Sequence, residues 1–149
     1  MLDICLLGTG GMMPMPSRFL TAMLARLNGR LALIDCGEGT QVTMKMLGWG
    51  FKAIDVICFT HFHADHISGL PGLLLTIGNA GRTESLTLIG PVGLQRIVEG
   101  LTLIAPELPF PIEYIELDKD TPNPIQVGAF EIHHCPADHM VKCFAYRID

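Results

Sequence analysis

Metal-binding side chains are concentrated in seven residues near the middle of the chain. Residues 60–66 read Thr-His-Phe-His-Ala-Asp-His, so three of the six histidines share one short segment with an aspartate. Neutral imidazoles and a carboxylate are the ligands that zinc and similar divalent ions take at about 2.0–2.2 Å. No packing rule favours this composition, so the segment predicts a metal site that draws on His61, His63, Asp65 and His66.

The flanking residues place these ligands at the end of a strand. Ile54–Phe59 is a short apolar run typical of a buried strand, and a helix is expected to begin near His66 and end at Gly78-Asn79. A loop held between a rigid strand and a helix can fix several ligands at once. The chain is therefore expected to be an α/β protein in which this loop carries the chemistry.

Other segments predict an alternation of helices and hairpins around a mixed sheet. Expected strands cover residues 2–7, 21–27, 31–34, 86–89, 112–117, 125–127, 130–134 and 141–148; expected helices cover 38–47 and about 90–103. Asn28-Gly29 is the strongest hairpin signal in the sequence. Prolines at 14, 16, 106, 109 and 111 are expected to interrupt regular structure.

Length and composition indicate one cytoplasmic domain. The 149 residues fit a single core, but 49% apolar residues and a mean hydropathy of +0.40 suggest that one face is covered by something else. No apolar run reaches the roughly 18 residues of a membrane span, and Asp3 stands where a signal peptide would be basic. The five cysteines are odd in number and scattered, so they are expected to be reduced, buried thiols.

The net charge of −5 excludes a general phosphate-binding surface. Any RNA binding must then be local or be supplied by another part of the protein. The glycine-rich segment at residues 8–11 is a weak candidate for a phosphate cradle, because no helix pattern follows it.

Three further side chains have competing interpretations. Asp35, at a strand end, either orients a ligand imidazole or caps the next helix. His134 is either a core or interface histidine or a ligand. His139 follows Pro136-Ala137-Asp138 in a loop before an expected strand and is a candidate ligand from a distant part of the chain.

The motif Thr-His-x-His-x-Asp-His resembles the signature of the metallo-β-lactamase superfamily. Leu7–Gly11, Asp35–Gln41 and Cys143–Ile148 resemble the ribonuclease Z branch, the endonucleases that trim the 3′ end of precursor tRNA. The resemblance implies the N-terminal half of a four-layer αββα sandwich, with a mixed sheet and helices on one face. It covers nearly the whole of residues 1–149, as a single domain.

The resemblance also implies roles for individual residues. His61, His63 and His139 would hold one zinc ion, whereas Asp65 and His66 would begin the site of a second and Asp65 would act on the attacking water. The implied activity is a zinc-dependent phosphodiesterase that cleaves precursor tRNA by attack of metal-bound hydroxide. A homodimer is the expected assembly.

The family's bridging aspartate and last histidine ligand would follow Ile148, and Ala145 replaces its usual glycine. We therefore expect the N-terminal half of a longer enzyme, incomplete for catalysis alone. Two alternatives stay open: a metallo-β-lactamase-fold hydrolase of small esters or phosphodiesters, and a non-catalytic metal-binding half-domain that assembles with a partner.

Overall fold

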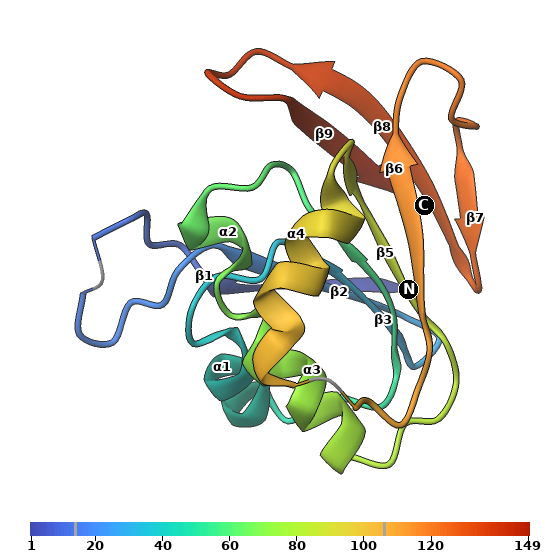
Figure 1. Cartoon of the computed structure of the whole chain (residues 1–149). Coiled ribbons are helices and arrows are strands. Elements are labelled where there is room, and N and C mark those ends of the chain that lie inside the picture. Colours follow the sequence, from blue (N-terminus) through green and yellow to red (C-terminus); the bar gives the residue numbers. More distant parts are fainter. Residues whose placement is uncertain (14, 106) are drawn as a thin grey trace.

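Three layers stack on one another in the computed structural model, which describes residues 1–13, 15–105 and 107–149 (Figure 1). The middle layer is a six-stranded sheet of β1 (Leu2–Gly8), β2 (Ala22–Leu27), β3 (Arg30–Ile34), β4 (Ile54–Cys58), β5 (Leu86–Pro91) and β6 (Ile112–Leu117), in that spatial order. One face carries α1 (Thr40–Leu47), α2 (Ala64–Ile67), α3 (Leu70–Asn79), α4 (Leu94–Leu101) and a 3₁₀ turn (Thr102–Ile104). The other face carries an antiparallel sheet of β7 (Ile125–Val127), β8 (Phe130–Ala137) and β9 (Cys143–Ile148). The predicted α/β class, with a mixed sheet and helices on one face, is confirmed.

The six-stranded sheet changes direction at β3. Strands β1, β2 and β3 pair antiparallel, whereas β3, β4, β5 and β6 run parallel. Asn28 and Gly29 join β2 to β3 with φ angles of 51° and 80°, the left-handed conformation that a two-residue hairpin turn requires. The parallel half brings the carboxyl ends of β3 and β4 to the same edge, which is where the site lies.

Two apolar cores hold the layers together. The larger lies between the helices and the middle sheet, and its fully buried members include Leu24, Leu33, Ile57, Phe59, Leu70, Leu73 and Leu88. The smaller lies between the two sheets, where Ala25, Ala32, Val56, Ile89, Phe130 and Ile132 meet. The central strands are apolar on both faces because each face is covered by a different layer.

The single helix expected from His66 to Asn79 is wrong, because the structure divides it at Gly69. The Gly69 amide donates to the Cys36 carbonyl at 2.9 Å, and a Cβ at Gly69 would lie 2.1 Å from the Gly37 carbonyl oxygen. The loop after β3 therefore crosses the chain at this point. Only glycine allows so close an approach, and the helix restarts after it as α3.

The helix expected from residue 90 is also wrong at its start. Gly90 and Pro91 continue β5, where Pro91 lies opposite Leu117 of β6, and α4 begins only after Gly93, whose φ is 100°. Strand β8 likewise runs past its expected end to Ala137, because its pairing with β9 continues to Cys143. Pro14 and Pro106 lie outside the described residues.

The predicted burial of the cysteines is correct for two residues and wrong for the other three. Cys36 and Cys58 are fully buried, and burial raises the pKa of the Cys36 thiol to about 12, so it stays protonated. Cys135 is exposed, and Cys5 and Cys143 are half-buried, because they lie at the margins of the sheets. No disulfide joins any of the five. Within the described part of the chain, no helix combines the length and the apolar character needed to cross a membrane.

Tyr146 of β9 links the three-stranded sheet β7–β9, the outer sheet, to the end of β4. Its hydroxyl donates to the Phe59 carbonyl at 2.8 Å, and burial raises its pKa above the usual range. We expect Tyr146→Phe to lower the free energy of unfolding by about 1–3 kcal/mol, because a buried carbonyl loses its donor. Urea denaturation measures the change.

Tyr114→Phe is the matched control. Tyr114 is the chain's other tyrosine and is partly buried, but its hydroxyl makes no hydrogen bond with the described residues. An equal loss of stability in both variants would contradict a specific role for the Tyr146 hydroxyl.

Candidate metal centre

The loop that follows β4 gathers three imidazoles around one point. His61, His63 and His139 each offer a nitrogen, and these nitrogens all lie within 4.8 Å of one another. His61 Nε2 is 3.0 Å from His63 Nδ1. The His139 ring centroid is 4.6 Å from that of His61 and 5.2 Å from that of His63. The predicted triad is therefore brought together, although His139 lies more than seventy residues further along the chain.

This arrangement suits a divalent cation. Tetrahedral coordination at about 2.0–2.1 Å places two ligand nitrogens roughly 3.3 Å apart, close to the His61–His63 separation. Three imidazoles packed this closely can share one cation, but three protonated rings would repel one another. The donor set therefore fits zinc.

Asp65 and His66 form a second pair beside the triad. His66 Nε2 lies 3.6 Å from Asp65 Oδ2, and the His66 ring centroid is 4.1 Å from that of His61. Both residues belong to α2, a helix of four residues that directly follows His63. Asp65 is buried, and a Cβ at Gly11 would lie 3.9 Å from its Oδ2, so the loop after β1 lies beside Asp65.

Asp35 connects these residues to the sheet. Its Oδ1 accepts the Thr60 amide at 2.8 Å, and its Oδ2 lies 2.8 Å from the Thr60 hydroxyl and 2.7 Å from His66 Nδ1. The carboxylate thus accepts a hydrogen bond from His66 Nδ1–H, so that in the neutral ring Nε2 carries the lone pair and faces Asp65. Gly39, not Asp35, is the N-cap of α1. Of the two interpretations of Asp35, the structure supports the one in which it orients a candidate ligand.

Thr60 is a site residue that sequence reasoning left without a role. Its hydroxyl donates to Asp35 and lies 3.0 Å from His61 Nδ1, so its oxygen can accept a hydrogen bond from the N–H of that nitrogen. This tautomer frees His61 Nε2 for the triad. The signal that could have found it is a hydroxyl residue at the strand end, directly before the first histidine.

The remaining histidines lie elsewhere. His134 Nε2 is 3.2 Å from the Pro122 carbonyl, and its ring packs against Phe144, so it has a structural role. His133 pairs with Asp149 at 3.2 Å on the outer sheet. Cys143, which the sequence did not single out for the site, places its sulfur 4.0 Å from His61 Nδ1.

The surroundings move the pKa values of His61 and His66 in opposite directions. Burial, together with the nearby His66 and His63 imidazoles, lowers the pKa of His61 to about 4. Burial also opposes protonation of His66, but the hydrogen bond and charge of Asp35 outweigh it and raise the His66 pKa. His61 is thus neutral, and ready to bind a cation, over most of the pH range.

Comparisons with known proteins identify the family to which the chain belongs. The family model described as Anti-Pycsar protein Apyc1 matches residues 2–98, which are 97 of the 149 residues. The chain belongs to this family. It also matches ribonuclease Z of Clostridium kluyveri, with 60% identity over 149 residues that cover 100% of this chain and 49% of that protein. The chain thus corresponds to the N-terminal half of ribonuclease Z and spans about half the length of the curated relatives it matches.

Members of the wider fold bear out the architecture. The crystal structure of human tRNase Z, short form, superposes with a TM-score of 0.83 at 29% identity, covering 100% of this chain and 65% of that one. Zn²⁺-bound PqqB from Methylobacterium extorquens shares the fold at a TM-score of 0.60 and 15% identity, covering 89% of this chain and 46% of that one. The metallo-β-lactamase fold is therefore shown, and zinc is bound by at least one protein that has it.

We predict a distinctive titration of the metal-free protein. Nuclear magnetic resonance should show His61 titrating near pH 4 and His66 above its ordinary pKa. Between about pH 6.5 and pH 4, His61 is neutral in the folded protein but protonated in the unfolded chain. The contribution of His61 to stability should therefore fall as the pH drops through this range. The contribution of His66 has the opposite sign and is lost as the pH rises through its folded pKa.

Asp35→Asn tests the cause of the His66 shift. Removal of the carboxylate should lower the His66 pKa below its wild-type value and leave the His61 midpoint low. A His66 midpoint unchanged by this substitution would show that Asp35 does not set it.

Proposed function

We propose that this chain is the N-terminal half of a cytoplasmic, zinc-dependent endoribonuclease of the ribonuclease Z type, which removes the 3′ trailer of precursor tRNA. The observation that carries the proposal is the convergence of His61, His63 and His139 on one point, in a chain 60% identical to a ribonuclease Z. The net charge of −5 is consistent with a protein in which another segment, or the second subunit of a homodimer, supplies part of the RNA-binding surface.

Each site residue has a defined task in this proposal. His61, His63 and His139 would hold one zinc ion, and Asp65 and His66 would contribute to a second. Bound zinc supplies Lewis-acid activation of water and neutralises charge that develops on the phosphate. Asp65 would orient the attacking water and accept its proton on a carboxylate oxygen.

Asp35 and Thr60 would act through the ligands. Asp35 would accept a hydrogen bond from His66 Nδ1–H, and the Thr60 hydroxyl would accept one from His61 Nδ1–H, so that each neutral ring presents the lone pair of its Nε2. The remaining ligands of the second ion would come from the half of ribonuclease Z that this chain does not span.

Zinc content distinguishes a half-built centre from a complete one. We expect the purified, tag-free chain to bind about one zinc ion, because three imidazoles supply one site and two side chains only begin another. His61→Ala and His139→Ala should each lower zinc affinity about tenfold or more, as measured by competition with a chromophoric chelator. His134→Ala, whose ring hydrogen-bonds to Pro122, is the matched control and should bind zinc as wild type does. Two tightly bound ions per chain would contradict the assignment.

Activity distinguishes ribonuclease from small-molecule hydrolase. We expect the 149-residue chain alone to cleave precursor tRNA weakly or not at all. A fusion to the C-terminal half of Clostridium kluyveri ribonuclease Z should cleave it at the 3′ trailer, and Asp65→Ala should lower that rate at least a hundredfold, because the water loses its proton acceptor. Faster hydrolysis of small esters or phosphodiesters than of tRNA would favour the alternative hydrolase, and efficient tRNA cleavage by the isolated chain would contradict a half-enzyme.

A further inference from the structure

Strand β1 presents a row of aliphatic side chains to solvent, on the face of the middle sheet opposite the helices. Leu2, Ile4 and Leu6 alternate along the strand and are 38%, 59% and 66% exposed. Cys5 and Leu7 point the other way, into the core beneath the helices. A strand with one face in water normally carries polar residues on that face. The exposed face of β1 therefore has the composition of a covered one.

Strand pairing extends this row across the sheet. Residues directly opposite each other on paired strands point to the same face, so the register identifies the neighbours of the β1 side chains. The cross-strand rows are Leu2–Leu27, Ile4–Ala25–Ala32 and Leu6–Met23–Ile34. Ala25 and Ala32 belong to the core between the two sheets, whereas no residue of β1 does. The apolar face of β1–β3 thus continues that core beyond its present edge.

The outer sheet ends before it reaches β1. Its spatial order is β7, β8, β9, so one edge of β9 has no strand partner within the described part of the chain. A hollow of about 230 Å³ lies along this edge, lined by Leu2 and Ile4 of β1 and by Tyr146 and Ile148 of β9. The packing of sheet on sheet therefore stops at β9, and β1 is left uncovered.

The charges around this face leave it free of acidic groups. In the rows that cross β1–β3, the one charged side chain is Arg30, opposite Leu27, and it is paired with Asp55. Asp3 alternates with Leu2 and Ile4, so it projects to the helical side. The chain carries a net charge of −5, so two copies repel each other over most of their surface. The β1–β3 face adds no carboxylate to that repulsion.

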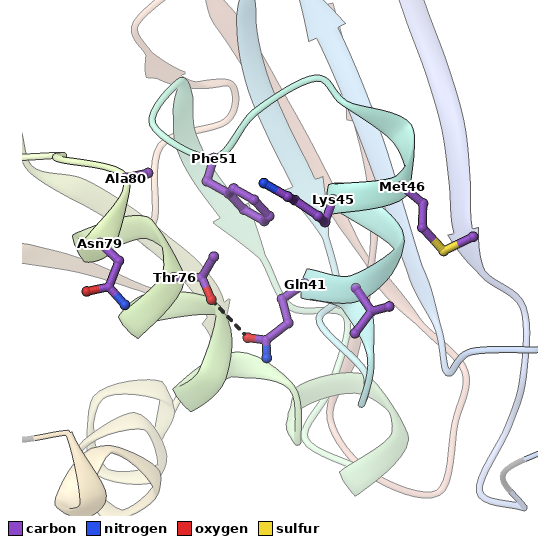
Figure 2. Close-up of a pocket in the computed structure, with 8 residues that line it drawn as sticks. Gln41, Lys45, Met46, Phe51, Thr76, Asn79 and Ala80 are labelled. Atoms are coloured by element: carbon purple, nitrogen blue, oxygen red, sulfur yellow. Dashed lines mark hydrogen bonds between the residues drawn. The ribbon is translucent and has the colours of Figure 1, made fainter.

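The helical layer exposes apolar side chains too, but they are mixed with polar ones. Between α1 and α3, Phe51 and Met46 lie among Gln41, Lys45 and Asn79 (Figure 2). Single apolar residues in such surroundings are ordinary on a protein surface. A contiguous apolar patch marks a surface that contacts another protein.

We propose that two copies of this chain pack their β1–β3 faces against each other about a two-fold axis. Each copy contributes the same patch to such a contact, and an aliphatic face without carboxylates is complementary to itself. Sheets pack face to face about 10 Å apart, as β4–β6 and the outer sheet already do, so the second copy extends an existing core. The face is small for a specific interface, and the dimer should therefore have a dissociation constant in the micromolar range.

A second copy is distinct from the other polypeptide that this face could meet. The chain covers 49% of Clostridium kluyveri ribonuclease Z, and the half that it does not span is a competing occupant. The self-contact rests on the apolar face and not on the proposed zinc chemistry. Dimerisation and zinc binding are therefore measured separately, and either can fail without the other.

Sedimentation velocity of the purified, tag-free chain over a range of concentrations tests the proposal. We expect the mass to rise with concentration from 16.3 kDa to twice that value. Ile4→Lys should weaken the dimer at least about fiftyfold, because two ammonium groups would be buried without partners. Leu6→Lys should do the same. Both side chains are mostly exposed in the single chain, so both variants should keep the wild-type circular dichroism spectrum and zinc content.

Leu103→Lys is the matched control. Leu103 is 80% exposed in the 3₁₀ turn of the helical layer, and its substitution should leave the dimer unchanged. Hydrogen–deuterium exchange locates the contact: β1 should exchange more slowly in the wild-type dimer than in Ile4→Lys, and Thr102–Ile104 should exchange equally in both.

Three results would overturn the proposal. One is a chain that stays monomeric at the highest concentration. Another is a dimer that survives both Ile4→Lys and Leu6→Lys, or that is lost in Leu103→Lys. The third is a monomeric chain that forms a one-to-one complex with the C-terminal half of Clostridium kluyveri ribonuclease Z, weakened by Ile4→Lys, which would assign the face to that half.

Discussion

The carboxylate of Asp35 is the contact on which the candidate centre depends. It follows the last residue of β3 with a φ of 58°, a left-handed conformation that is uncommon for a residue other than glycine. In that position it accepts bonds from the Thr60 amide, the Thr60 hydroxyl and His66 Nδ1. One buried anion therefore joins the ends of two parallel strands and sets the tautomer of a candidate ligand. The backbone strain is offset by three hydrogen bonds to a charged acceptor, each stronger than a neutral one.

The layered architecture explains how a distant histidine reaches this loop. The small core between the sheets seats β8 and β9 against the face opposite the helices. The Phe144 amide of β9 donates to the Thr60 carbonyl at 2.9 Å, and the Tyr146 hydroxyl donates to the Phe59 carbonyl. These two hydrogen bonds fix the position of the outer sheet relative to the loop after β4. His139, in the turn between β8 and β9, is carried over His61 and His63 as a result.

The helical face is organised by close crossings that only glycine permits. Gly37 and Gly69 let the segment after β3 pass beside the break between α2 and α3, while Gly72 makes room for Gln41. The first crossing fixes α2, and with it Asp65 and His66, relative to the sheet. At Gly72, the Gln41 side chain of α1 packs against α3.

Local sequence was sufficient for much of this protein. The Asn28-Gly29 turn, the apolar β4 segment and the dense spacing of His61, His63, Asp65 and His66 act over a few residues, where turn geometry and hydrophobic pattern decide the outcome. The family resemblance could be recognised from the sequence for the same reason, because each of its motifs is one contiguous segment. His139 was placed by resemblance, and the residues alone could not have joined it to the triad.

Only the tertiary structure decided the features that depend on segments crossing in space. The break at Gly69 arises because the loop after β3 passes there, and β5 continues through Pro91 because β6 offers it a partner. The role of Asp35 was undecided until the two strand ends were seen together. Hydrogen bonds and close approaches between residues 25 or more positions apart have no local signature, whereas turns and ligand spacing do. For that reason the clustered ligands of the candidate metal centre could be predicted from the sequence, whereas the contact with His139 and the orientation and support of the ligands could not.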